Sequence, residues 1–284
     1  MNVTLSNSNL LAQINSQGAE LFSLKSIANN KEYMWEGNPK FWAKHSPVLF
    51  PIVGTLKNNT YFYNDEQFQL LRHGFARDND FQVIKQEQNQ VQFSLKASVE
   101  TKKIYPFEFE LILTYTLLEN KLEIKYSIIN RDIVAIPFSI GAHPAFALPL
   151  NFENYSLEFQ EQETLKCFTL EDDLVSDTTF EIELKDKKLP LAYTTFENDA
   201  LIFKTLQSKE VAILENNKPF LKVSFSDFEN LGIWTKVGAP FICIEPWLGY
   251  SDTIHSSGNL PEKDGIKIVK ENKTFDCQFS IEIL

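Results

Sequence analysis

Apolar and polar residues alternate along most of this chain, as they do in strands with one face buried and the other in contact with solvent. The pattern is clearest over residues 91–97 and 122–128. It predicts further strands over 107–117, 155–159, 221–225 and 275–281. Helical periodicity is scarce, and its best candidates are the short segments 39–44 and 165–170. We therefore expect a nearly all-β protein.

Turn signals and large apolar residues indicate how these strands assemble. Two alternating runs meet at Glu119 and Asn120, which predicts an antiparallel hairpin because asparagine tolerates a left-handed backbone. Twenty-four phenylalanines supply bulky side chains for a core between two broad sheets. No linker rich in glycine, serine or proline divides the chain. We expect residues 1–284 to form a single domain, a large antiparallel β-sandwich.

Charge and composition exclude several classes of function. With 38 acidic and 27 basic side chains the net charge is −11, which repels nucleic acid and anionic lipid surfaces. No apolar run is long enough to span a membrane and no secretory signal is evident, so we expect a cytoplasmic protein without a membrane partner. The cysteines Cys167, Cys243 and Cys277 lie far apart, which argues against a disulfide framework or a thiolate metal site.

Arginine is rare in this chain, and two of its three arginines lie close together. Arg72 and Arg77 flank His73 and a glycine in the segment Leu-Arg-His-Gly-Phe-Ala-Arg, where the strand alternation breaks. One interpretation is a loop whose cations pair with surface carboxylates. The other is the wall of a polar pocket in which Arg77 presents its planar fork of donors to hydroxyl or phosphate oxygens.

Two further segments place an ionisable residue in apolar surroundings. His143 lies at a predicted strand end, where its titration range suits proton transfer, and a core histidine bonded to a backbone carbonyl is the alternative. Glu245 interrupts the apolar run 240–247; its burial costs several kcal/mol unless the carboxylate is hydrogen-bonded or functional. Desolvation would raise its pKa, as suits a general base near neutral pH. Asp199 precedes a predicted strand and fits a turn or a pocket equally well.

Other chemistries find less support. His73, His143 and Glu245 lack the HxH or HExxH spacing of a metal site, so we expect no metal. The Gly-x-Ser-x-Gly elbow of serine hydrolases and phosphate-binding glycine loops are both missing. A glycoside hydrolase or lyase would need a second carboxylate near Glu245, and Asp199 is the candidate for it.

In their order along the chain, these motifs resemble the aldose 1-epimerase (galactose mutarotase) family and are most similar to its LacX-like branch. The segments that carry the resemblance are 46–54, 72–77, 141–146 and 232–249. The resemblance implies a β-supersandwich with a sugar-binding cleft on one sheet, and no metal or organic cofactor. In one departure, Thr55 follows Gly54 where family members often have arginine, so one cationic contact to the substrate is replaced or lost.

The resemblance also implies catalytic roles. Glu245 would be the general base at the anomeric hydroxyl, His143 the general acid toward the ring oxygen, and His73 a hydrogen-bonding partner near the same oxygen. We therefore expect an isomerase that interconverts the α and β anomers of a hexose or hexose phosphate. The alternative is a non-catalytic carbohydrate-binding or sensing protein with the same cleft.

The expected substrate-binding residues complete this set. The resemblance places Arg77 and Asp199 against sugar hydroxyls. Arg72 and Lys57 are the other cations beside these motifs, and whether the three cations bind a phosphate is open. Trp247 suits packing against the apolar face of a sugar, although core packing accounts for it equally well. A small-molecule sugar is thus the expected partner, and a homodimer is compatible with the sequence.

Overall fold

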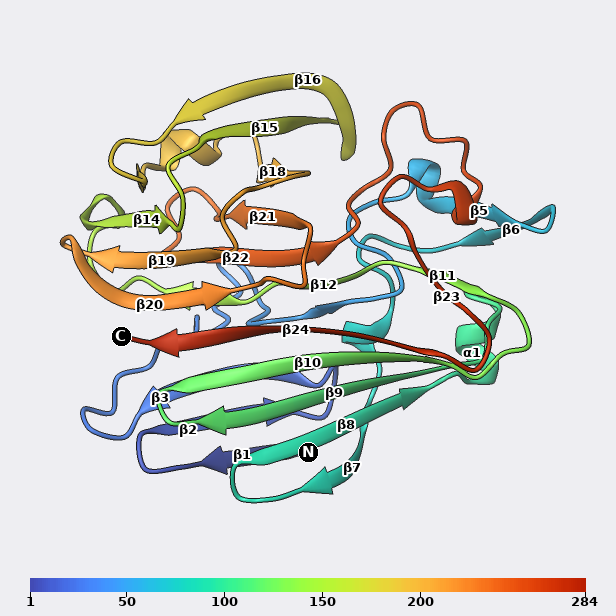
Figure 1. Cartoon of the computed structure of the whole chain (residues 1–284), viewed down its shortest axis with the longest axis horizontal. Helices are drawn as coiled ribbons and strands as arrows, with labels where there is room; N and C mark the ends of the chain where they lie inside the picture. Colours follow the sequence, from blue (N-terminus) through green and yellow to red (C-terminus); the bar gives the residue numbers. More distant parts are fainter.

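The computed structural model describes all 284 residues, and antiparallel strands make up most of it (Figure 1). The largest sheet has nine strands. Their order across the sheet is β17 (Lys188–Pro190), β14 (Tyr155–Phe159), β19 (Glu210–Glu215), β20 (Lys218–Ser224), β24 (Thr274–Ile283), β10 (Lys121–Asn130), β9 (Phe109–Leu118), β8 (Gln90–Lys96) and β7 (Gln82–Gln86).

The second sheet has eight strands and carries the residues of the candidate site. Its order is β16 (Leu174–Glu183), β15 (Thr164–Glu171), β18 (Leu201–Phe203), β21 (Asn230–Trp234), β22 (Phe241–Leu248), β12 (Ile140–Ala142) and β4 (Val48–Leu49). The eighth strand, β13 (Ala145–Ala147), also pairs with β22. Two short strands, β12 and β13, therefore share one edge of β22, and the residues between them are left outside the ladder.

Smaller elements complete the fold. Three short sheets are formed by β1 (Asn2–Ser6), β2 (Leu10–Asn15) and β3 (Glu20–Ser26), by β5 (Thr60–Tyr63) and β6 (Glu66–Gln69), and by β11 (Ile136–Phe138) and β23 (Lys267–Val269). The helical elements are α1 (Val99–Lys102) and the 3-10 turns η1 (Lys57–Asn59), η2 (Ala76–Asp78), η3 (Phe152–Asn154), η4 (Tyr193–Phe196) and η5 (Leu260–Glu262). None of these helices is long and apolar enough to cross a membrane.

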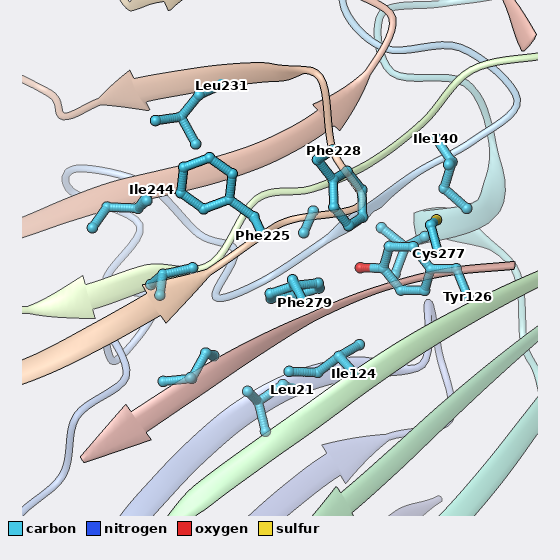
Figure 2. Packing of buried hydrophobic residues seen from close by; sticks show 14 of the residues in the cluster. Leu21, Ile124, Tyr126, Ile140, Phe225, Phe228, Leu231, Ile244, Cys277 and Phe279 are labelled. Atoms are coloured by element: carbon cyan, nitrogen blue, oxygen red, sulfur yellow. The ribbon is translucent and has the colours of Figure 1, made fainter. Parts of the chain in front are cut away.

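The hydrophobic core lies between the two large sheets. Figure 2 shows Leu231 of β21 and Ile244 of β22 on one side and Phe279 of β24 on the other, with Phe225 and Phe228 between them. These residues belong to one continuous cluster of 69 buried apolar side chains. The aromatic bodies fill the space between the sheets because large rigid side chains bury the most area per residue. The predicted all-β antiparallel sandwich is confirmed.

Some local predictions were wrong or need refinement. Residues 165–170 lie in β15, where Leu165 and Cys167 are buried and Lys166 between them is exposed. Residues 39–44 form turns instead of a helix. The hairpin between β9 and β10 has the predicted two-residue loop. Its left-handed residue is Glu119, with a φ of 52°, while the Asn120 side chain donates a hydrogen bond to the Ile283 carbonyl at 2.7 Å.

Candidate active site

A cleft of about 690 Å³ opens against the eight-stranded sheet, and its size is typical of a small-ligand site. It receives side chains from strand β22, from the loop between β12 and β13, and from the loop that leads into η2. Seven of the residues singled out in the sequence line it: Arg72, His73, Arg77, His143, Asp199, Glu245 and Trp247. Segments distant in sequence are thus brought to one place by the sheet order.

Glu245 and His143 form the buried centre of the cleft. Glu245 lies in the middle of β22, paired with Gly232 of β21, and is only 1% exposed. His143 follows β12, in the gap that the two short strands leave beside β22. The Nε2 atom of His143 lies 3.2 Å from Oε2 of Glu245. Although this distance suits proton transfer, the two groups are not aligned as a hydrogen bond, and Oε2 has no hydrogen-bond partner.

Burial sets the protonation of this pair. It raises the pKa of Glu245 well above its ordinary value, and the Asp199 carboxylate acts in the same direction, whereas Arg72 opposes it. Burial also lowers the pKa of His143 to about 3, with the Arg72 and Arg77 guanidinium groups contributing. Both shifts favour uncharged groups. The uncharged pair, a carboxyl group on Glu245 and a neutral imidazole on His143, carries one proton in total.

His73 is fixed as a neutral hydrogen-bond donor. The backbone N–H of Gly54 donates to its Nδ1 atom at 3.1 Å, so the ring hydrogen must lie on Nε2. Since Nε of Arg72 is also a donor, we assign no hydrogen bond to the 3.4 Å contact between it and Nε2. Burial and the neighbouring His143, Arg72 and Arg77 lower the pKa of His73 well below its ordinary value. A neutral ring with Nε2–H is therefore the form present.

A left-handed backbone turns His73 toward the cleft. His73 and Gly74 have φ values of 69° and 68°. Gly74 is required here because a Cβ atom would overlap the carbonyl group of Phe50. A non-glycine residue such as His73 in this region carries a conformational cost of order 1–3 kcal/mol, which is typical of functional sites.

The two arginines occupy one side of the cleft and have different partners. Arg72 is half exposed and pairs with Asp173 in the turn between β15 and β16, with Nη1 and Oδ1 3.0 Å apart. Arg77 donates from Nη2 to the Arg72 carbonyl at 2.8 Å, and its Nε atom lies 3.6 Å from Asp78. The Nε atom of Arg77 is buried without a hydrogen-bond partner. Arg77 is thus the cation with an unused donor in the cleft.

Lys57 does not line the cleft, contrary to the expectation that it helps to bind substrate. Its backbone N–H donates to Asp252 at 2.9 Å, and its ammonium group donates to the Ile254 carbonyl at 2.8 Å. These two hydrogen bonds hold the residue against the loop that follows β22. Sequence proximity to the Gly54 motif was a misleading guide in this case.

Asp199 and Trp247 contribute to the cleft in different ways. Asp199 is partly buried, has a φ of 88°, and its carboxylate accepts the Ala200 N–H at 2.8 Å. The residue therefore makes the turn into β18 and lines the cleft as well. The Trp247 indole lies between Gly141 and Gly232, where a Cβ atom on either glycine would overlap the ring. Its Nε1 atom has no hydrogen-bond partner.

The sequence interpretation missed an aromatic enclosure around His143. Trp42 stacks on the imidazole with ring centroids 4.7 Å apart and planes at 26°. Trp234 meets the same ring edge-on at 5.8 Å and 82°. Trp42 lies in an irregular segment between β3 and β4, where alternation carries no information. The sequence did contain one indication: Trp42 lies outside any strand pattern, and a large apolar side chain in a loop is expected to pack against another part of the protein.

Unpartnered buried polar atoms are concentrated in this cleft. Six buried side-chain polar atoms in the structure have no hydrogen-bond partner, and four of them belong to residues that line the cleft: Nε of Arg77, Nδ1 of His143, Oε2 of Glu245 and Nε1 of Trp247. Buried polar atoms are normally hydrogen-bonded, so a set of donors and acceptors without partners indicates a polar ligand. A ligand with several hydroxyl groups can donate and accept at once.

Comparison with known proteins identifies the family. Residues 1–273 match the family described as aldose 1-epimerase. The chain belongs to this family. The LacX proteins of Lactococcus lactis subsp. lactis, plasmid and chromosomal, are 34% and 35% identical to it over the full length of both chains. The resemblance drawn from the sequence motifs is thereby confirmed.

Solved structures of galactose mutarotase-like proteins share the fold. A galactose mutarotase related enzyme from Lactobacillus acidophilus is 34% identical, with a TM-score of 0.95 over 100% of this chain and 97% of that one. A galactose mutarotase-like protein from Lactobacillus casei is 29% identical, with a TM-score of 0.95 over the whole of both chains. The fold is therefore that of galactose mutarotase-like proteins.

In this aldose 1-epimerase family member, three potential metal ligands lie close together at the base of the cleft, although only His143 and Glu245 line it. Donor atoms of His143, Cys243 and Glu245 lie within 4.8 Å of one another. Cys243, however, packs in an apolar cluster with Trp35 and Phe241, and burial raises the pKa of its thiol well above the ordinary value. Metals bind the thiolate, so a thiol held neutral is a poor ligand. The set fits acid and base chemistry better than metal binding.

Proposed function

We propose that this protein is an aldose 1-epimerase that interconverts the α and β anomers of a hexopyranose. One observation carries the proposal: a buried carboxyl group and a buried imidazole, on Glu245 and His143, lie 3.2 Å apart in a cleft whose lining residues hold four buried polar atoms without hydrogen-bond partners. A protein that only binds sugar needs hydroxyl partners, but it does not need an acid and a base side by side.

The reaction needs one proton removed and one delivered. A base takes the proton from O1 while an acid protonates O5, so the C1–O5 bond breaks and C1 becomes an aldehyde. Rotation about C1–C2 then presents the other face of the carbonyl, and closure reverses both proton transfers. Because Glu245 and His143 hold one proton between them, one group is always an acid while the other is a base. The ring opens and closes without a net change in the proton count of the pair.

Other cleft residues orient the sugar for these transfers. The Nε2–H of His73 supplies a neutral donor, which suits the ring oxygen because a donor stabilises the negative charge that develops there. Arg77 and Asp199 offer a cationic donor and an anionic acceptor to hydroxyl groups, and the Trp247 indole covers an apolar face. Each positioned proton transfer contributes a factor on the order of 10²–10⁴ to the rate.

A neutral hexose is the favoured substrate. Arg72 is already paired with Asp173, and Arg77 lies beside Asp78, so neither guanidinium group is free of a carboxylate. The chain also carries a net charge of −11, which opposes an anionic ligand at long range. Hexose phosphates nevertheless belong in the assay, because the same two arginines are the groups that would recognise a phosphate.

The activity is measured by polarimetry on freshly dissolved α-glucose and α-galactose, and by NMR saturation exchange between anomers for hexose 6-phosphates. We expect a rate of anomer exchange that rises in proportion to protein concentration above the buffer rate. If the protein accelerated anomer exchange of the hexose phosphates only, the proposed substrate class would be wrong but the reaction type would stand. No acceleration with any neutral or phosphorylated aldose would contradict the proposal, and sugar binding without exchange would assign a binding protein instead.

A further inference from the structure

Acid–base catalysis in this cleft requires a charged state that burial disfavours. Burial favours the uncharged forms of Glu245 and His143, yet a carboxylate base and an imidazolium acid arise only when the shared proton moves to His143. The transfer takes a proton from Oε2 of Glu245 to Nε2 of His143 across 3.2 Å and leaves the total charge of the pair unchanged. Something in the cleft must stabilise the imidazolium ring.

Trp42 is placed to do this. Its indole faces the imidazole with a centroid separation of 4.7 Å and an interplanar angle of 26°, within the distance at which a cation interacts with an aromatic face. Tryptophan is the aromatic residue with the strongest such interaction. By contrast, Trp234 and His73 lie roughly perpendicular to His143, at 82° and 84°, and do not stack on its ring.

Several hydrogen bonds hold the backbone of the segment around Trp42. The Trp42 carbonyl accepts a hydrogen bond from Nε1 of Trp35 at 2.9 Å. Glu20 accepts the N–H groups of His45 and Ser46 at 2.7 and 3.0 Å, and the His45 carbonyl accepts the Ala145 N–H. The stack is therefore built into the fold, in a segment that carries no regular secondary structure.

We propose that Trp42 is a positioning residue, which holds the His143 ring toward Glu245 and stabilises its imidazolium form through the face of the indole. The inference rests on the proposed epimerase function. Other ionisable groups also lie near His143 on the surrounding elements: Glu245, Cys243, His73, Arg72, Arg77 and Glu20. Their identity does not change when only the indole of Trp42 is altered.

The sharpest test changes the electronics of the indole without changing its shape. Mono-, di- and trifluorinated tryptophan are incorporated at position 42 alone, because each fluorine weakens the negative potential of the ring face. We expect kcat to fall in steps, by about tenfold over the series, while KM stays within about twofold. A kcat that is constant across the series would overturn the proposal, as would an effect on KM alone.

A second readout on the same proteins needs no substrate. The imidazole ¹⁵N chemical shifts of His143 report the protonation of the ring. Because the ring is mainly neutral at pH 7, the shifts are followed as the pH is lowered toward 3, and we expect the shifts at low pH to move toward the neutral ring with each fluorine. Shifts that do not change would overturn the inference even in an active enzyme. If no aldose is turned over, the epimerase proposal fails separately, and these shifts still decide whether Trp42 stabilises the imidazolium.

Ordinary substitutions provide a matched comparison. Trp42→Phe keeps an aromatic face and Trp42→Leu removes it, so we expect kcat in the order Trp, Phe, Leu, with Leu lowest by at least about tenfold. Phe22→Leu is the control, since Phe22 meets His45 at 6.1 Å and neither residue lines the cleft. An equal loss in Phe22→Leu would indicate a structural effect and overturn the specific role of Trp42. If Trp42→Leu does not fold, the fluorinated series decides.

Discussion

At the scale of single residues, burial affects the protonation of the ionisable groups in the cleft more than their hydrogen-bond partners do. Desolvation favours the uncharged forms of Glu245, His143 and His73, and one backbone N–H group fixes the tautomer of His73. Glu245 Oε2 and His143 Nδ1 make no hydrogen bond within the protein. The strain of a left-handed His73 is consistent with selection for orientation instead of stability.

Glu245→Gln tests the central assignment. The amide keeps the shape of the side chain but is a poor base, and it cannot share a proton with His143. We expect the rate of anomer exchange to fall by a factor on the order of 10²–10⁴, measured by polarimetry, with the thermal midpoint of unfolding nearly unchanged. Since both proteins pass through the same purification, retained activity in the variant would show either a contaminating epimerase or a wrong role for Glu245.

The pair also predicts how stability varies with pH. When unfolded, it binds two protons below pH 4.5, one from 4.5 to 6.5 and none above 6.5, the ordinary pKa values of Glu and His. When folded, the pKa of His143 is about 3 and burial raises that of Glu245, so from about pH 3 until Glu245 ionises the pair keeps one proton. Between pH 3 and 4.5 the unfolded state thus binds more protons, and above 6.5 it binds fewer for as long as folded Glu245 stays protonated. Stability therefore rises with pH up to 4.5 and declines from 6.5 until Glu245 ionises.

This dependence is measured by urea denaturation between about pH 3.5 and pH 8.5. The limiting slope on either side is about 1.4 kcal/mol per pH unit. The double variant His143→Gln, Glu245→Gln removes both titrating groups, and subtracting its curve isolates the contribution of the pair. A difference curve without a maximum between pH 4.5 and 6.5 would show that the pair is charged in the folded protein.

At the scale of elements, the site is organised by β22 and its neighbours. β22 is buried along its whole length and carries both Glu245 and Trp247. The glycines Gly141 on β12 and Gly232 on β21 leave the space that the Trp247 indole fills. Because glycine has no side chain, β12 and β21 leave room for the indole that forms part of the cleft wall.

Gly232→Ala tests this arrangement. Its methyl group would overlap the six-membered ring of Trp247, so we expect a loss of about 1–3 kcal/mol in the free energy of unfolding, measured in urea. Adding Trp247→Phe removes the overlapped part of the indole, so the double variant should lose less than the sum of the two single losses. Strictly additive losses would mean that the two side chains do not meet.

Strand periodicity explains which parts of this architecture were predictable. In runs such as 122–128, apolar and polar residues alternate because one face of the strand packs against the core. The positions of these strands can therefore be predicted from the sequence. Glu245 and His143 were identifiable because an ionisable group in an apolar run needs a partner or a function. The distance between them was not predictable, since it depends on how β12 and β13 share one edge of β22.

The remaining misjudgements arose in irregular segments. Trp42 reaches the cleft through a loop without periodicity, and Lys57 is directed away by contacts with a loop almost 200 residues later in the chain, as its bond to Ile254 shows. Both placements are set by long-range packing. The helix expected over 165–170 failed because pairing with β16 and β18 decided the conformation of that segment.

At the scale of the whole molecule, one core joins the two large sheets and the three-stranded sheet. The cluster of 69 buried side chains includes Leu5 of β1, Phe93 of β8 and Ile244 of β22. No boundary in this core separates one half of the chain from the other. The prediction of a single domain over residues 1–284 can therefore be tested through the cooperativity of unfolding.

Thermal unfolding should take place in one transition. We expect the calorimetric enthalpy to equal the van't Hoff enthalpy, and far-UV circular dichroism to report the same midpoint as calorimetry, because the sheets cannot lose their shared core independently. Two separated heat-capacity peaks would show that the chain contains two cooperative units. Reversibility on rescanning is required for the comparison to hold.

The distribution of tryptophan has a practical consequence. The chain has four tryptophans: Trp42, Trp234 and Trp247 line the cleft, and Trp35 packs against Phe41, which also lines it. Intrinsic fluorescence excited at the indole absorption band therefore originates entirely from the neighbourhood of one site. The unlabelled protein carries its own optical probe, so a panel of sugars can be ranked by changes in emission, including those that bind without being turned over.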